Sequence, residues 1–132
     1  MTETTHWWWL RHAPIASQEG RIHGQDDIPC RALNGADLAT LSETLPSGAV
    51  WMASPLSRAR DTAHAITGRQ PRIEDELAEQ NFGRWQGMTW DEVRDRDGNA
   101  WRAFWENPAG TPAPNGESFA EAASRVIDAV RC

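Results

Sequence analysis

The sequence contains no lysine and no tyrosine, and all 13 of its cationic side chains are arginine. Schiff-base chemistry and a P-loop are therefore excluded, because each requires a lysine. The two cysteines, Cys30 and Cys132, are too few for a disulfide framework or a four-thiolate zinc site. The histidines show no spacing typical of metal ligands, so we expect neither a metal nor another cofactor.

Long apolar runs and basic blocks are absent as well. No apolar run approaches the roughly 20 residues that a membrane span requires. The start MTETTHWWWLRH lacks the basic stretch and long apolar core of a signal peptide. The formal net charge of -6 argues against non-specific binding to nucleic acid. We therefore expect a cytoplasmic protein with no membrane or nucleic-acid partner, and the sequence does not indicate its oligomeric state.

The length suits a single domain, residues 1–132. The apolar run at 6–10 predicts a first strand buried on both faces, and residues 49–53 predict a second strand. Helices are expected over 36–45, where leucines recur at helical spacing, and over 55–67. This alternation predicts an α/β fold, a three-layer sandwich with a mostly parallel sheet and helices on both faces.

The second half of the chain predicts mainly helices. Two capping boxes begin at Thr89 and Ser118. Between them Asn99 is the expected cap of a further helix that Pro108 ends, and Ile73 marks a short strand. The last helix carries an apolar stripe that is expected to cover a sheet: Phe119, Ala122, Ala123, Val126, Ile127 and Val130. Two strands alone do not make a stable layer. We therefore expect a fold that is incomplete at the C-terminus.

Eight tryptophans are present, and two uses are open for them. They could form a stacking platform for carbohydrate, or they could pack in the core. Most lie in expected strands or at helical spacing, such as Trp101 and Trp105. Core packing is therefore the favoured interpretation.

The first chemical signal is the pair Arg11 and His12, directly after the first expected strand. In α/β sheets, ligands bind at the carboxyl ends of the strands. A cation and an imidazole at that place suit an anionic ligand. The alternative is a pair that only bonds to carbonyl groups of the loop.

The second signal is the pair Arg58 and Arg60 in the first turn of a helix for which Ser54 is the expected N-cap. Cations are disfavoured there, because a helix N-terminus already carries partial positive charge. A bound anion reverses that preference, which favours phosphate or carboxylate at this place. The alternative is a solvated helix face paired with Asp61 or other nearby carboxylates.

The third signal is Glu79 in the segment LAEQNFGRWQG. Leu77, Phe82, Gly83 and Trp85 are expected to form an apolar wrap around it. A carboxyl group in such surroundings can keep its proton and act as a general acid. The alternative is an ordinary solvated acidic face.

Five segments together resemble the histidine phosphatase superfamily, also called the phosphoglycerate mutase-like family. They are LRHAP, GRIHGQDDIP, SPLSRARDTA, LAEQNFGRWQGMTWDEV and PNGESFAEAASRV. They occur in the order and approximate spacing of the family, and they cover most of the chain.

The resemblance implies a role for each matching residue. His12 matches the nucleophile that becomes phosphohistidine, and Glu79 matches the proton donor to the leaving alkoxide. Phosphate binding is implied for Arg11 and Arg58, and a place in the substrate pocket for His23, Gly24 and Arg60. The implied activity is the metal-free hydrolysis of a small phosphomonoester, such as an α-ribazole phosphate or a sugar phosphate.

The chain also departs from the family pattern. Ala13 stands where the family commonly has glycine, and Ser17 is a candidate for a phosphate donor that the family places nearby. The second catalytic histidine of the family, at the end of a further strand, has no counterpart here. We therefore expect a C-terminally truncated member, and a non-catalytic anion-binding or regulatory remnant is the alternative function.

Overall fold

The structure is a computed structural model that describes residues 2–16 and 20–131, so Ser17 and Cys132 lie outside it. Within these ranges it has five α-helices and one parallel pair of short strands. The elements are α1 (Gly35–Thr44), β1 (Met52–Ala53), α2 (Ser57–Thr67), β2 (Arg72–Ile73), α3 (Trp90–Arg96), α4 (Gly98–Glu106) and α5 (Phe119–Arg131). The predicted α/β class and parallel pairing are confirmed.

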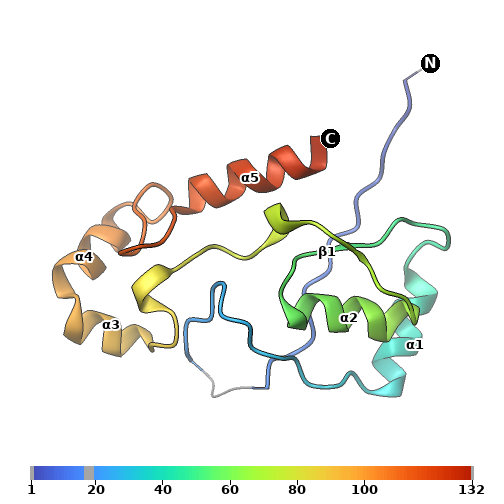
Figure 1. The fold of residues 1–132 in the computed structure, drawn as a ribbon, viewed down its shortest axis with the longest axis horizontal. Coiled ribbons are helices and arrows are strands. Elements are labelled where there is room, and N and C mark those ends of the chain that lie inside the picture. Colours follow the sequence, from blue (N-terminus) through green and yellow to red (C-terminus); the bar gives the residue numbers. More distant parts are fainter. Residues whose placement is uncertain (1, 17–19, 132) are drawn as a thin grey trace.

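The elements form two groups along the long axis of the molecule (Figure 1). At one end α1 packs on α2, and α2 packs on β1; at the other end α3 packs on α4. Between them α5 lies against the 3₁₀ turn Asp75–Leu77. The irregular segment after that turn crosses the middle of the molecule and joins the two ends (Figure 1).

Most helix boundaries follow from the predicted caps. The Thr89 capping box is present, and Ser118 and Glu121 exchange the same pair of hydrogen bonds at the start of α5. The helix for which Asn99 was the expected N-cap is instead capped two residues earlier, at Asp97, and it runs from Gly98 to Glu106. These boundaries depend on contacts within one turn, which a sequence displays directly.

The start of α2 differs from the prediction. Leu56 is the N-cap and makes no side-chain capping bond, so Ser54 is not the cap. Instead the Asp27 carboxylate accepts a 2.7 Å hydrogen bond from the backbone N–H of Ser57. A carboxylate from a distant loop therefore satisfies the helix N-terminus.

The predicted strand at 6–10 is wrong. Residues 6–10 form no strand, and Trp7, Trp8 and Trp9 are 44%, 57% and 64% exposed. β1 pairs with β2 in the register Met52 with Arg72, so the apolar run has no ladder partner among the described residues. A run of large apolar side chains shows a tendency to be buried, but burial also requires a neighbouring strand.

The main core lies at the α3 and α4 end instead. Trp85 and Val93 are fully buried, and Trp85 meets Phe104 edge to face with ring centroids 5.4 Å apart. The buried cluster consists of Ile22, Trp85, Val93, Phe104 and Ala113. The prediction of core packing is therefore correct for Trp85 and for Trp90 and Trp101 beside it. It is wrong for the three N-terminal tryptophans and for Trp105, which is 51% exposed.

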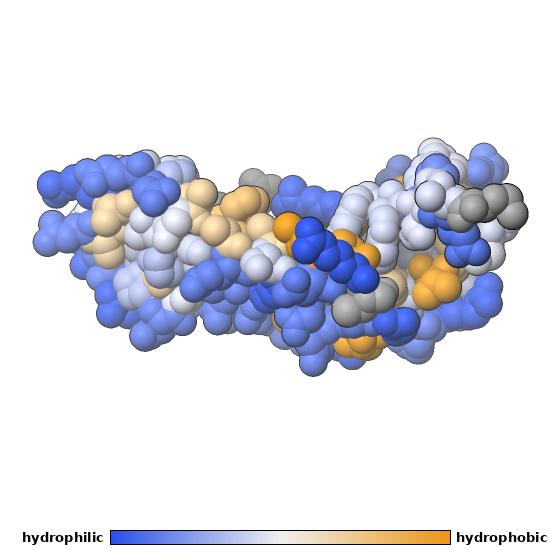
Figure 2. All heavy atoms as spheres, turned by 90° about the horizontal axis from the view of Figure 1, so that it is seen from above, coloured by the Kyte–Doolittle hydropathy of each residue, from blue (hydrophilic) through white to orange (hydrophobic). Residues whose placement is uncertain are grey.

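The apolar stripe of α5 does not cover a sheet as expected. Ala122 is buried, but Phe119 and Ile127 are 59% and 43% exposed, and α5 packs on the Asp75–Leu77 turn. The two short strands of the described sheet offer too little surface to cover a helix of this length. The view in Figure 2 shows a mostly hydrophilic surface with apolar residues in separate patches.

Gly83 is a position where an added methyl group should be costly. Its φ is +49°, and a Cβ there would meet the backbone of Pro114, Asn115 and Gly116. We expect Gly83→Ala to lower the free energy of unfolding by about 3 kcal/mol, from left-handed strain and the clash together. Gly87→Ala is the matched control, because Gly87 has a φ of +84° but open space around it. Chemical denaturation of both variants compares the losses, and an equal loss would contradict the steric argument.

Candidate active site

A cavity of about 530 Å³ lies between the N-terminal segment and the β1 to α2 connection. Arg11, His12, Arg58 and Glu79 all line it. Three segments that are distant in the sequence therefore contribute the four residues with the strongest chemical signals to the lining of one cavity. The rest of the lining is mostly apolar and includes the tryptophans at 7–9 and 51.

The ring of His12 is oriented by the backbone. Its Nδ1 lies 2.7 Å from the carbonyl oxygen of Ala13. A carbonyl oxygen can only accept a hydrogen bond, so Nδ1 carries the hydrogen and the lone pair of the neutral ring is on Nε2. This hydrogen bond therefore selects the tautomer whose lone pair is on Nε2.

Thr62 holds the loop that follows His12 onto α2. Its buried hydroxyl oxygen accepts a 2.8 Å hydrogen bond from the N–H of Ala13 and donates a 2.7 Å bond to the carbonyl of Arg58. The sequence reasoning missed this residue. The sequence did contain a signal for it: Thr62 follows Arg58 by four positions, which places the two residues on one face of a helix.

Replacement of Thr62 tests this anchor. Thr62→Val keeps the size of the side chain but leaves the buried N–H of Ala13 without its acceptor. We expect a loss of about 1–3 kcal/mol in the free energy of unfolding. Thr40→Val is the control, because Thr40 is exposed and bonds only within α1. Urea denaturation should show a loss within about 0.5 kcal/mol for this control, and equal losses in the two variants would exclude the anchor.

Arg58 is a buried cation with protein acceptors on several sides. Its side chain is 2% exposed. Its Nη1 donates to the carbonyl oxygen of Asp26 at 2.7 Å. Its Nη2 donates to the carbonyl oxygen of Gly24 at 2.5 Å and to Glu79 Oε2 at 2.9 Å. Buried charges persist when they are paired and hydrogen-bonded. Glu79, a carboxylate of the chain itself, is therefore the partner of Arg58, and binding of an external anion at this helix turn stays a prediction.

The apolar wrap expected around Glu79 is wrong. The side chain of Glu79 is 48% exposed, and Arg58 is its ion-pair partner. Trp85 and Phe82 pack into the core instead of around the carboxyl group. The segment between the 3₁₀ turns is irregular, so neighbours in the sequence point to different sides of the chain.

His23, Gly24 and Arg60 are not among the described residues that line the cavity. Gly24 has a φ of +52° and supports Arg58 through its carbonyl group. Arg60 has a buried Nε without a hydrogen-bond partner among the described residues. Hydrogen bonds from Ser57 and the charge of Arg60 hold the pKa of the Asp27 carboxyl group below its ordinary value.

The described part of the chain offers neither a metal site nor a membrane-spanning helix. Over 2–16 and 20–131, no group of three or more His, Cys, Asp or Glu side chains is placed to hold a metal ion. No helix in the same part of the chain is long and apolar enough to cross a bilayer.

Comparison with known proteins identifies the family. The family model of the histidine phosphatase superfamily (branch 1) matches residues 7–132. The chain is 37% identical over 128 residues to a bifunctional protein of Mycobacterium tuberculosis, covering 89% of this chain and 34% of the relative. It is 31% identical over 122 residues to the glucosyl-3-phosphoglycerate phosphatase of the same organism, covering 88% and 54%. The chain therefore belongs to the histidine phosphatase superfamily.

A solved structure supports the same assignment. The native structure of mycobacterial glucosyl-3-phosphoglycerate phosphatase matches with a TM-score of 0.74 and 28% identity, over 91% of this chain and 59% of that one. The chain thus spans about half the length of the glucosyl-3-phosphoglycerate phosphatases that it matches.

Proposed function

We propose that the chain carries the active site of a phosphatase that hydrolyses a small phosphomonoester through a phosphohistidine intermediate. The observation that carries the proposal is that His12, Arg58 and Glu79 line the same cavity. In the neutral ring of His12 the lone pair is on Nε2. Nη2 of Arg58 lies 2.9 Å from Oε2 of Glu79. A nucleophile, a phosphate-binding cation and a proton donor are the parts that such a reaction needs.

The reaction proceeds in two balanced steps. In the first, Nε2 of His12 attacks phosphorus, the bond from phosphorus to the leaving oxygen breaks, and protonated Glu79 gives its proton to the leaving alkoxide. In the second, water attacks the phosphohistidine, the bond from phosphorus to nitrogen breaks, and the Glu79 carboxylate takes a proton from the water. The products are an alcohol and inorganic phosphate, and both residues return to their starting states.

Arg11 and Arg58 supply the positive charge in this proposal. A phosphoryl group in transfer spreads negative charge over its oxygens, so its transfer depends on positioning and electrostatic stabilisation. Arg11 is exposed on the cavity wall and can meet an incoming phosphate first. Arg58, which lines the same cavity, is held in place by the carbonyl groups of Gly24 and Asp26.

The substrate class in the proposal is a small phosphorylated metabolite. Relatives of this chain bear the names glucosyl-3-phosphoglycerate phosphatase and metal-independent phosphoserine phosphatase, which favours a phosphatase over a mutase. The roles of His23, Gly24 and Arg60 in substrate binding, the single domain over 1–132 and the cytoplasmic location stay predictions.

The test combines turnover with anion binding. Purified chain is incubated with p-nitrophenyl phosphate, and inorganic phosphate binding is followed by NMR of the histidine rings. After His64 the sequence has no histidine, so the second-histidine role has no candidate in that part of the chain. Losing one such group typically costs about 10² to 10³ in kcat, so a high protein concentration is needed. Turnover supports the proposal, while phosphate binding without turnover supports the anion-binding remnant instead.

A further inference from the structure

The backbone around Glu79 belongs to no helix or strand. After the 3₁₀ turn Asp75–Leu77, the chain is irregular until the next turn, Gly83–Trp85. An irregular segment has no ladder of hydrogen bonds, so its carbonyl groups must find partners elsewhere. The position of the Glu79 carboxyl group therefore depends on what holds this segment.

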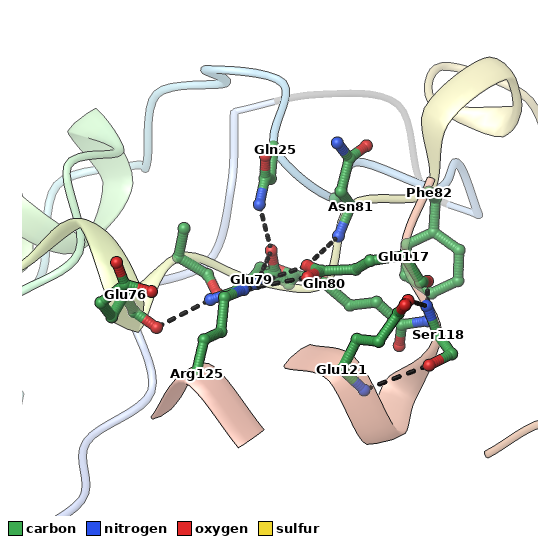
Figure 3. A network of polar contacts seen from close by, with 12 residues as sticks. Gln25, Glu76, Glu79, Gln80, Asn81, Phe82, Glu117, Ser118, Glu121 and Arg125 are labelled. Carbon is green, nitrogen blue, oxygen red and sulfur yellow. Dashed lines mark hydrogen bonds and ion pairs between the residues drawn. The ribbon is translucent and has the colours of Figure 1, made fainter. Parts of the chain in front are cut away.

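Arg125 of α5 holds three carbonyl groups of the segment at once. One terminal nitrogen donates to the carbonyls of Glu76 and Ala78, both at 2.7 Å, and the other donates to the carbonyl of Glu79 at 3.0 Å. Figure 3 shows the guanidinium group reaching up from α5 to this stretch of backbone. Gln25 donates to the same carbonyl of Glu79 from the opposite side, at 3.0 Å.

Glu117 holds the segment on the other side of Glu79. Its carboxylate receives Nε of Arg125 at 3.0 Å and the backbone N–H of Asn81 at 2.8 Å. Its own backbone accepts from the side chain of Gln80 and donates to the carbonyl of Asn81. Arg125 and Glu117, called the clamp below, thus fix the backbone before and after Glu79.

The clamp is itself rigid and strongly charged. Both of its side chains are only 19% exposed. The hydrogen bond from Arg125 holds the pKa of the Glu117 carboxyl group below its ordinary value, and the same bond raises the pKa of Arg125. Glu117 directly precedes the Ser118 capping bonds that begin α5 (Figure 3). Glu117 thus lies just before α5 and Arg125 lies within it.

We propose that the clamp is a positioning pair, which holds the carboxyl group of Glu79 against Arg58 on the cavity wall. Arg125 and Glu117 do not line that wall among the described residues, so they act through Glu79. The inference rests on the proposed function, because it assigns what places the proton donor of that reaction. A shift of about 1 Å in such a group can cost about 10²-fold in rate.

The first test needs no turnover. The guanidinium ¹⁵N resonances of Arg58 report its bond to Glu79. Introducing Glu79→Gln into the native chain is expected to shift these resonances. Introducing it into the Arg125→Ala variant is expected to shift them by less than half as much. Arg84→Ala is the control, because it removes the exposed ion pair with Asp97, away from the cavity. If Arg125→Ala does not fold, Glu117→Gln takes its place. An undiminished response in the folded variant overturns the proposal.

The second test uses turnover. Arg125→Ala is expected to slow hydrolysis of an alkyl phosphate about 10- to 100-fold while changing that of p-nitrophenyl phosphate by a few-fold at most. Arg125→Lys should recover part of the loss, and Arg84→Ala should show none. In a Glu79→Gln background, Arg125→Ala should add no further selectivity between the two substrates. Equal losses on both substrates overturn the positioning role. A native chain without any turnover contradicts the proposed function. In that case the NMR test alone decides whether the clamp positions Glu79.

Discussion

His12→Ala is expected to abolish phosphoryl transfer by this chain. The substitution removes the imidazole that lines the cavity directly after Arg11 and whose Nδ1 lies 2.7 Å from the carbonyl oxygen of Ala13. Without a nucleophile no phosphohistidine forms, and the remaining arginines can only bind the phosphate. Turnover of p-nitrophenyl phosphate should fall to the level of the buffer. A residual rate within a few-fold of the native chain would exclude His12 as the nucleophile.

The control for this result is His64→Ala. His64 is exposed in the last turn of α2, where its carbonyl accepts the capping bond from Gly68, and its side chain does not line the cavity. Its replacement should leave the rate unchanged. Added imidazole offers a second check, because it can occupy the space of the missing ring. Partial recovery of turnover in His12→Ala, and none in Arg58→Ala, would assign the loss to the nucleophile.

Glu79→Gln is expected to slow the hydrolysis of substrates with basic leaving groups much more than that of substrates with good leaving groups. A proton donor matters when the departing alkoxide is basic, and general acid catalysis typically supplies about 10² to 10⁴-fold. Hydrolysis of an alkyl phosphate should therefore fall by about that factor. Hydrolysis of p-nitrophenyl phosphate should change little, because nitrophenolate leaves without a proton. Steady-state kinetics on the two substrates measure both effects.

The amide is a suitable replacement, because its oxygen can still accept the hydrogen bond from Arg58. Glu76→Gln provides the matched control: Glu76 is an exposed carboxylate three residues away, and its side chain does not line the cavity. It should leave both rates unchanged. If Glu79→Gln slows both substrates equally, Glu79 binds phosphate or supports Arg58 and is not the proton donor.

The local parts of the structure were predictable from the sequence. The capping box at Thr89, the end of α2 at Gly68 and the short strand at Ile73 all lie where the residues predict them. Each depends on neighbours a few positions apart. Arg11, His12, Arg58 and Glu79, to which the family motifs assign roles, all line one cavity, while those roles stay predictions.

The parts that failed depend on distant contacts. The capping of α2 by Asp27 joins residues 30 positions apart, and the bond from Ala13 to Thr62 joins residues 49 apart. Nothing in the periodicity of either segment shows such a partner. The exposed run at 6–10 fails for the same reason, because a strand is defined by its neighbour and not only by its own side chains.

The most direct test of the account is to trap and map the phosphorylated residue. The chain is mixed with p-nitrophenyl phosphate, quenched in alkali, where phosphohistidine survives, and digested for mass spectrometry. The account predicts one phosphoryl group on the peptide that contains His12, labile to acid, and none in His12→Ala. A phosphoryl group on His6, His23 or His64, or turnover without any phosphorylated chain, would contradict it.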